Sequence, residues 1–358
     1  MRKSIWMFVL ALSACALMMA TGASAKEKPV PQPFKTTVHS PQGINGNNGS
    51  ISAREGDERR KGSNEDYLWA KEHLRKSRRS FVEVIDRWLE MYNTANVSKA
   101  DKIFTPDFVP HFPAVQLVGV VDRASYLAKA VNPGALNTHI VLDDFFGVAD
   151  EMVGRFTITA TWPPNKPYTN TAIVFFRFED GRIAEEWWEA DFMGVLEQAG
   201  QLPPTRPAFA YVWSPPSPVK GYPSGAGQNA SLACRSVQAA NAVNFPLWAS
   251  MISADYVNHD PVAWYATDRA TEAAFMQFMF TAFPDQRFTI EDIVASRDRV
   301  ALRLTITGTQ LGKFGALPAT GRQVHWSGMA IFRIADGKIV EGWWSEDVLD
   351  LMQQLTAP

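Results

Sequence analysis

Apolar and polar residues recur with two different periods along this chain, and each period predicts one kind of element. Between residues 67 and 92 the large apolar residues fall mostly three and four positions apart, which places them on one face of a helix. From residue 300 to 307 the larger apolar side chains occupy every second position, as in a strand with one packed face. The dipeptides Asp180-Gly181 and Asp336-Gly337 stand between apolar runs and are typical of tight β-hairpin turns. The order of helices first and strands afterwards predicts an α+β fold.

Two segments rich in breaking residues interrupt this pattern. Residues 26–63 are rich in Pro, Gly, Asn and Ser and contain few large apolar residues, which predicts a disordered linker. Residues 202–229 contain seven prolines, each of which fixes φ and removes a backbone donor. The predicted domains are therefore residues 64–201, with an N-terminal helical extension, and residues 230–358.

The two predicted domains are copies of one another. Ordered matches occur in three stretches, and the third follows a loop that is eight residues longer in the second copy. The matching stretches are 107–113 with 255–261, 155–159 with 303–307, and 176–183 with 332–339. In each copy the last stretch is followed by Glu, by Trp-Trp and by Asp. Residues 64–201 are called the first repeat below, and residues 230–358 the second repeat.

The N-terminus predicts export. Two basic residues precede an apolar run, 5–20, and a small-residue cleavage motif ends at Ala25. Residues 1–25 are therefore predicted to be a signal peptide, and the mature protein is expected to be periplasmic or secreted. The alternative is a lipoprotein, because residues 12–15 resemble a lipobox that would anchor a lipid on Cys15. No later stretch approaches the ~20 continuous apolar residues of a membrane span.

Charge and motif content narrow the class of partner. The chain has 35 Lys and Arg against 37 Asp and Glu, a formal net charge of -2, and no long basic stripe, so nothing indicates a nucleic-acid partner. Neither His-Glu-x-x-His nor a cysteine pair at metal-ligand spacing occurs. Gly-x-Ser-x-Gly and a dinucleotide-binding glycine motif are also missing from the sequence. We therefore expect a small-molecule partner, no metal and no cofactor.

The closing motif of each repeat carries a family resemblance. Asp-Gly-Arg/Lys-Ile-x-Glu-x-Trp-x-x-x-Asp, preceded by an Asp-Tyr/Phe-Val-x-His segment, resembles the SnoaL-like polyketide cyclase family of the nuclear-transport-factor-2-like fold. The resemblance covers residues 78–201 and 230–356 and is fuller in the second repeat, which also has a Gly-rich loop within 307–322. It implies two tandem cone-shaped α+β barrels, each a curved, mostly antiparallel sheet wrapped on N-terminal helices around an apolar pocket. It also implies an internal pseudo-dimer, with a further homodimer as an extension of it.

The resemblance implies catalytic positions as well. A carboxyl group in an apolar cone has its charged form disfavoured, which raises its pKa towards the value that a general base needs. Asp347 and Asp191 match the terminal Asp of the motif and are the predicted acid/base residues. His259 and His111 occupy matching positions and are the predicted donors to a substrate carbonyl. The structural alternatives are that the aspartates cap the following helices and that backbone partners satisfy the histidines.

Three further side chains are predicted to contact substrate. His325 lies on the incoming strand of the second repeat, where the first repeat has Thr169. Trp343 and Trp187 come from the Trp-Trp pairs, whose two members point to opposite faces of a strand. At most one member of each pair can therefore line the pocket, and the alternative is that all four tryptophans pack in the core and an interface.

These observations favour an exported enzyme that uses no cofactor. We expect a cyclase, lyase or isomerase acting on a hydrophobic carbonyl-bearing molecule, because the family runs such acid/base reactions. The second repeat is the better candidate, since the first lacks the Gly-rich loop. The alternative is a non-catalytic ligand-binding or structural module, because fold alone assigns no reaction.

Overall fold

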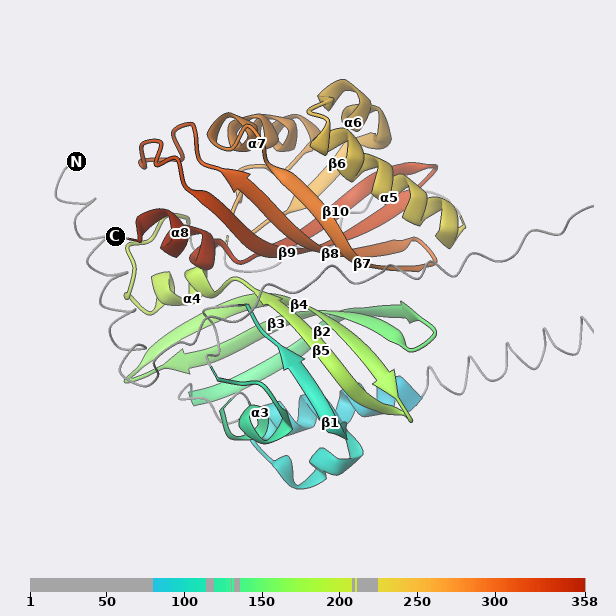
Figure 1. Ribbon diagram of the computed structural model, residues 1–358. Coiled ribbons are helices and arrows are strands. Elements are labelled where there is room, and N and C mark those ends of the chain that lie inside the picture. Colours follow the sequence, from blue (N-terminus) through green and yellow to red (C-terminus); the bar gives the residue numbers. More distant parts are fainter. Residues whose placement is uncertain are drawn as a thin grey trace, which may run out of the picture. The chain divides into compact units, whose positions relative to one another are not determined.

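A computed structural model describes residues 80–113, 119–129, 131, 136–207, 210 and 225–357. They belong to one compact unit, which spans residues 80–358 (Figure 1). The predicted signal peptide, the predicted linker 26–63 and most of the predicted Pro-rich linker lie outside the described residues, so these interpretations stay predictions. No helix in the described part of the chain is long and apolar enough to cross a membrane.

The first repeat combines several short helices with an open five-stranded sheet. Residues 80–94 are helical. The following elements are η1 (Val97–Lys102), β1 (Phe104–His111), α3 (Arg123–Lys129), β2 (Leu136–Val148), β3 (Glu151–Trp162), β4 (Lys166–Glu179), β5 (Arg182–Ala190) and α4 (Phe192–Gln198). The strand order is β1-β5-β4-β3-β2, in which only the β1–β5 pair is parallel.

The second repeat has the same topology. Its elements are α5 (Ala226–Asn241), α6 (Phe245–Met251), β6 (Ile252–His259), α7 (Arg269–Ala282), β7 (Arg287–Ser296), β8 (Arg299–Thr309), β9 (Gln323–Ala335), β10 (Lys338–Glu346) and α8 (Val348–Thr356). The strand order is β6-β10-β9-β8-β7, and α5, α6 and α7 cover one face of this sheet (Figure 1). The predicted tandem α+β fold is confirmed. The predicted barrels are wrong, because among the described residues β1 does not pair with β2 and β6 does not pair with β7, so neither sheet closes.

The hairpin turns follow the sequence prediction. Asp180 and Gly181 have φ of +50° and +72°, and Asp336 and Gly337 have φ of +50° and +68°. Positive φ at both central residues is the requirement of the type I′ turn, whose twist matches that of the flanking strands. The turns join β4 to β5 and β9 to β10, and so fix the register of the strands that carry the closing motif.

A matched pair of hydrogen bonds aligns the repeats where their sequences differ. The amide side chain of Asn93 donates to the carbonyl of Ile140 and accepts from its N–H, at 3.1 and 2.6 Å. Asn241 makes the same two bonds to Phe288, at 2.9 and 2.8 Å. Both members of each pair are 148 residues apart, as in the sequence repeat. The helix at residues 80–94 therefore corresponds to α5, position by position.

The two sheets contact each other through one apolar cluster. Its buried members are Val153, Ile173 and Phe175 from the first repeat, with Val294, Ala301, Met329, Ile331 and Trp343 from the second. At the edge of this cluster Arg299 Nε donates to Asp144 Oδ2 over 2.9 Å. The repeats are thus joined within the chain, and a homodimer of chains stays a prediction.

Candidate active site

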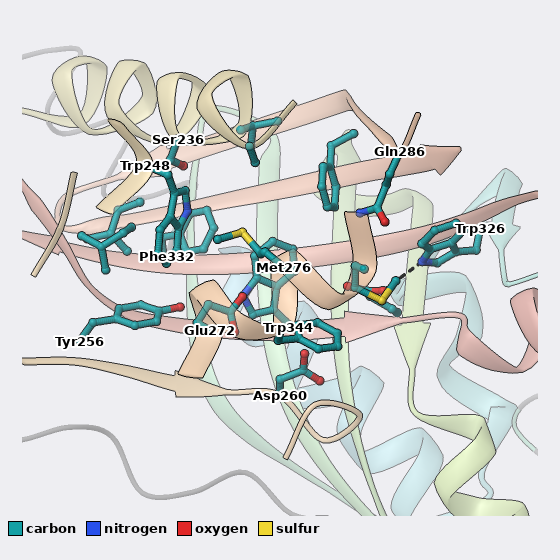
Figure 2. A pocket seen from close by; sticks show the side chains of 18 residues that line it. Ser236, Trp248, Tyr256, Asp260, Glu272, Met276, Gln286, Trp326, Phe332 and Trp344 are labelled. Carbon is teal, nitrogen blue, oxygen red and sulfur yellow. Dashed lines mark hydrogen bonds between the residues drawn. The ribbon is translucent and has the colours of Figure 1, made fainter. Parts of the chain in front are cut away.

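A cavity lies between helices α5, α6 and α7 and the sheet of the second repeat (Figure 2). It encloses about 750 Å³ of empty space, its opening included. Most of its wall is apolar, formed by Val237, Ala240, Trp248, Ile252, Phe275, Met276, Met279, Phe288, Phe332, Ile339 and Trp344. Such a wall fits a hydrophobic small molecule.

Two half-buried carboxyl groups face this cavity from the ends of neighbouring strands. Asp260 follows β6, and its Oδ1 accepts hydrogen bonds from the backbone N–H groups of Val262 and Ala263, at 2.8 and 3.0 Å. Glu346 ends β10, and its Oε2 accepts from Trp326 Nε1 over 3.0 Å (dashed in Figure 2). Because β6 and β10 are paired in parallel, both carboxyl groups lie at the same end of the sheet.

A third carboxyl group, that of Glu272, enters from the first turn of α7. It is buried, and its Oε2 accepts from Asn258 Nδ2 over 2.7 Å. Asn258 in turn accepts from the Tyr256 hydroxyl over 2.9 Å. Figure 2 shows Asp260 and Glu272 on the same side of the cavity as the ring of Trp344. An apolar cavity with three carboxyl groups is unusual, because each charged form loses hydration there.

This enclosure raises the pKa of all three groups. Burial, and then the negative charge of Asp260, raise the pKa of Glu346 from 4.5 to about 7, against the Trp326 hydrogen bond. Burial followed by the charges of Asp260 and Glu346 raises the pKa of Glu272 well above 4.5. Burial also raises the pKa of Asp260, but its two backbone N–H donors and Arg206 oppose this. The three carboxyl groups lie close enough to influence one another, and each holds its proton to a higher pH than a free carboxyl does.

The cavity also offers a donor. The indole N–H of Trp344 is buried and makes no hydrogen bond of normal geometry. It lies close to the Tyr256 hydroxyl, whose pKa burial raises well above 10 while the indole lowers it. Because this contact does not meet normal hydrogen-bond geometry, the carbonyl oxygen of a ligand in the cavity would be a better acceptor for the indole N–H.

The first repeat fills the corresponding space with aromatic side chains. At the 148-residue spacing, Trp88 and Tyr92 take the places of Ser236 and Ala240, and both are buried. Trp88 stacks on Trp188 at a centroid distance of 5.5 Å. The cavity of the second repeat therefore exists because two positions on α5 carry small side chains.

The polar groups of the cavity are replaced in the first repeat as well. Phe112 occupies the place of Asp260 at the same spacing, and Ala190 the place of Glu346 in the aligned hairpin. The helix caps Asp122–Ser125 and Asp268–Thr271 align Tyr126 with Glu272. All three carboxyl groups are thus specific to the second repeat.

Two family models match these repeats. The model described as SnoaL-like polyketide cyclase matches residues 231–355, and the model described as SnoaL-like domain matches residues 85–186. The chain carries two SnoaL-like domains in tandem. Their fold is that of a cyclase-type family whose members bind small-molecule substrates. A search of curated proteins found no match.

Solved structures similar to the chain each span little more than a third of it. IdmH from Streptomyces antibioticus is 31% identical, with 36% of this chain and 98% of that chain covered and a TM-score of 0.34. TsrD from Streptomyces laurentii is 24% identical, with 38% and 99% covered and a TM-score of 0.35. A SnoaL-like polyketide cyclase from Agrobacterium tumefaciens is 20% identical, with 36% and 97% covered and a TM-score of 0.32.

The two predicted acid/base residues cap helices in these SnoaL-like domains. Asp347 Oδ1 accepts from the backbone N–H of Asp350 over 3.1 Å at the start of α8. Asp191 Oδ1 accepts from Gly194 over 3.0 Å at the start of α4 and also pairs with Arg206. The capping interpretation is confirmed for both. Neither side chain lines the second-repeat cavity, and a catalytic role for either stays a prediction.

The predicted donor His259 is part of the contact between the sheets. Its Nε2 lies 2.8 Å from Glu341 Oε1, so the partner of this nitrogen is a carboxylate and not the backbone, while Nδ1 is buried without a hydrogen bond. Its ring stacks on Trp343 at 5.1 Å, and the guanidinium of Arg155, from the first repeat, lies 5.0 Å from the same indole. Trp343 is therefore held between the two repeats and does not line the cavity.

The first repeat uses its motif residues in the same way. His111 Nε2 lies 2.9 Å from Glu185 Oε2, and its ring stacks on Trp187 at 4.8 Å. Arg303, from the second repeat, lies 5.0 Å from the Trp187 ring. Trp187 and Trp343 thus pack in an interface and Trp188 in the core, as the structural alternative stated, whereas Trp344 lines the cavity.

Four of the seven predicted site residues do meet, in a second cleft between the sheets. Its lining includes His111, Trp187, His325 and Asp347, while Asp191, His259 and Trp343 lie elsewhere. No group of three or more His, Cys, Asp or Glu side chains among the described residues is placed to hold a metal ion.

The cavity carboxyl groups Asp260, Glu272 and Glu346 were not predicted. A signal for them is present in the sequence, namely the replacement of aromatic or small residues of the first repeat by acids in the second. Comparing the aligned repeats for new polar residues, instead of shared ones, would have found Asp260 and Glu346. Glu272 required the structure, because its helix aligns at a different spacing.

Proposed function

We propose that the second repeat is a cofactor-independent acid/base enzyme of the cyclase, lyase or isomerase type. Its substrate would be a hydrophobic small molecule with a carbonyl group, met after export of the protein. The observation that carries this proposal is the group of three carboxyls with raised pKa in an apolar cavity. Removal of a proton next to a carbonyl needs a base and an acid at once, and this cavity supports both.

The surroundings of each carboxyl suggest its role. Asp260 is the proposed base, because two backbone N–H groups and the charge of Arg206 favour its ionised form. Glu346 is the proposed acid, because burial and the charge of Asp260 let it keep its proton up to about pH 7. The N–H of Trp344 would donate to the carbonyl oxygen as negative charge develops on it.

Enolisation of a hydrophobic diketone tests these roles. Benzoylacetone in deuterium oxide exchanges its central protons when a base removes them, and NMR follows the exchange. We expect Asp260→Asn and Glu346→Gln to slow the protein-catalysed exchange by about 100-fold or more. Because Glu346 must hold a proton, the wild-type rate should fall as pH rises through about 7, and Glu346→Gln should lack this fall.

Asp347→Asn is the matched control, since it changes a buried carboxyl outside the cavity. It should keep the exchange rate if the assignment to the cavity is right. Loss of exchange in this variant, with full exchange in Asp260→Asn and Glu346→Gln, would instead identify Asp347 as the base.

The second candidate function is a non-catalytic small-molecule-binding module. It is favoured by the first repeat, which keeps the fold while Trp88 and Tyr92 fill the corresponding space. A wild-type protein that binds benzoylacetone but exchanges it no faster than buffer would support this function over catalysis.

A further inference from the structure

One polar side chain in the wall of the second-repeat cavity keeps an unused hydrogen-bond acceptor. Gln286 lines this cavity and is 5% exposed, yet its Oε1 has no hydrogen-bond partner among the described residues. The three carboxyl groups of the same wall differ from it, because the protein supplies a donor to each of them. A buried amide oxygen without a donor is costly, so it marks a place where the donor of a ligand would bind.

The chain on both sides of Gln286 is fixed by hydrogen bonds. Its backbone N–H donates to the carbonyl of Phe283 over 3.0 Å, in the turn between α7 and β7. The preceding residue, Asp285, accepts from the backbone N–H and the hydroxyl of Thr309, at 2.6 and 2.7 Å. Two positions further on, the N–H and the carbonyl of Phe288 both bind one asparagine side chain of α5. The carboxamide is therefore held at the cavity wall through its backbone, and its oxygen stays available to a ligand.

Gln286 lies far from the proposed base. Figure 2 shows Gln286 and Asp260 on opposite sides of the cavity. Asp260 follows β6 and Gln286 precedes β7, and these strands are the two edges of the sheet, with β10, β9 and β8 between them. A ligand whose carbonyl group lies among the carboxyl groups would therefore meet Gln286 with its opposite end.

The first repeat has no equivalent of this carboxamide. At the 148-residue spacing, Thr138 takes the place of Gln286. The alignment is fixed two positions further on, where Ile140 and Phe288 each bind the matching asparagine. The amide is thus specific to the second repeat, as are the three carboxyl groups. Polar residues that differ between the repeats and gather at one cavity favour a role in binding a ligand.

A hydroxyl group is the ligand group that fits this amide. It donates to Oε1 and, because it is also an acceptor, it suits the N–H groups of the same carboxamide. A water molecule would be a poorer partner, since a buried water needs several polar neighbours and most of this wall is apolar. A cationic donor is not called for, because the amide oxygen carries no charge to neutralise.

We propose that the substrate of the second repeat carries a hydroxyl group remote from its carbonyl, and that this hydroxyl donates to Gln286 Oε1. This proposal rests on the function proposed above and narrows its substrate class to hydroxylated hydrophobic carbonyl compounds. The carboxyl groups act on one end of such a molecule, and Gln286 binds the other end. Gln286 would thereby determine specificity without taking part in proton transfer.

Equilibrium dialysis of the full chain with matched ligands tests this proposal. The short pair is benzoylacetone and its para-hydroxyl derivative, and the long pair is naphthoylacetone and its derivative hydroxylated at the remote end of the naphthalene. In wild type, at least one hydroxylated ligand should bind about fivefold or more tightly than its parent, the gain expected of one hydrogen bond. The methyl ether of that ligand cannot donate and should lose this gain.

Variants locate the hydroxyl group. Gln286→Leu should bind the hydroxylated ligand no more tightly than its parent, because the amide oxygen is removed. Gln323→Leu, which changes an exposed glutamine of the same sheet, is the control and should keep the wild-type preference. Circular dichroism and thermal unfolding establish that each variant is folded, and Gln286→Met supplies an unbranched apolar side chain should Gln286→Leu not fold.

The proposal is overturned if wild type prefers neither hydroxylated ligand, if the methyl ether keeps the gain, or if the folded Gln286 variant keeps the preference. Dialysis measures binding without turnover, so the result is separable from that for the proposed enzyme. A preference for the hydroxyl without proton exchange contradicts only the catalytic function. Proton exchange without that preference contradicts only the role of Gln286.

Discussion

At the scale of single residues, Glu186 is a buried carboxyl group with a structural role, because it accepts hydrogen bonds from two tryptophans in the core of the first repeat. It is fully buried in the first repeat, where Trp88 Nε1 and Trp188 Nε1 donate to its two oxygens over 3.2 and 2.8 Å. Its aligned position in the second repeat is Gly342. Burial raises the pKa of Glu186 from 4.5 to about 7, although hydrogen bonds from Tyr126 and both tryptophans oppose the shift.

This pKa predicts a dependence of stability on pH. Because the folded-state pKa lies above the unfolded value, Glu186 stabilises the fold below about pH 4.5, and this contribution is lost as pH rises through about 7. A shift of this size corresponds to roughly 3 kcal/mol. We expect Glu186→Gln to remove roughly that much of the decrease in unfolding free energy between about pH 5 and about pH 8.

Urea unfolding followed by tryptophan fluorescence measures this decrease. Glu179→Gln, which changes an exposed glutamate of the same sheet, is the control and should keep the wild-type dependence. A Glu186→Gln variant whose stability changes with pH as much as that of wild type would show that Glu186 does not titrate in this range.

At the scale of elements, one helix decides whether a repeat has a cavity. The helix at residues 80–94 sends Trp88 and Tyr92 into the space that α5 leaves open with Ser236 and Ala240. Since both helices align at the same spacing and make the same asparagine hydrogen bonds, the difference lies in side-chain volume and not in backbone position.

We therefore predict that Ser236→Trp closes the cavity of the second repeat. The new indole would occupy the space that Trp88 fills in the first repeat, so the protein should stay folded while binding of benzoylacetone is lost. Ser231→Trp, on the exposed face of the same helix, is the control and should leave binding unchanged. Equilibrium dialysis measures binding, and retained binding in Ser236→Trp would mean that the diketone sits elsewhere.

Elements that depend on local sequence were predictable. The Asp-Gly turns have the positive φ that their sequence requires, and the alternation at residues 300–307 lies within β8. The repeat also predicted the shared topology, because aligned sequences fold alike. Closure of the sheets was not predictable, because pairing between the edge strands β6 and β7 leaves no mark in the local pattern.

The site was harder to predict because a strand has two faces. Trp343 and Trp344 are neighbours, yet the first packs between the repeats and the second lines the cavity. The alternation predicted opposite faces, but the sequence does not state which face turns towards the helices. Choosing Trp343 also selected Asp347, four residues on, and passed over Glu346.

At the scale of the whole molecule, the motif shared by both repeats mainly joins them. His111 with Trp187 and His259 with Trp343 form stacked pairs, and each tryptophan also meets an arginine of the other repeat. The candidate chemistry lies instead in residues that the repeats do not share. The first repeat thus keeps the motif, which contributes to the contact between the repeats, although it lacks the cavity that the second repeat has.

The contact between the sheets predicts that the two repeats unfold together. Ile331 and Ile334 both lie on β9 and are fully buried, but Ile331 belongs to the cluster between the sheets and Ile334 to the core of the second repeat. Ile331→Asp places a carboxylate among apolar side chains of both repeats, which separates them because a buried unpaired charge is costly. Scanning calorimetry of the full chain should then show two transitions where wild type shows one. Ile334→Ala should lower the free energy of unfolding by roughly 2–4 kcal/mol, and the protein should still unfold in a single transition. One undivided transition in Ile331→Asp would mean that the repeats are coupled by other contacts.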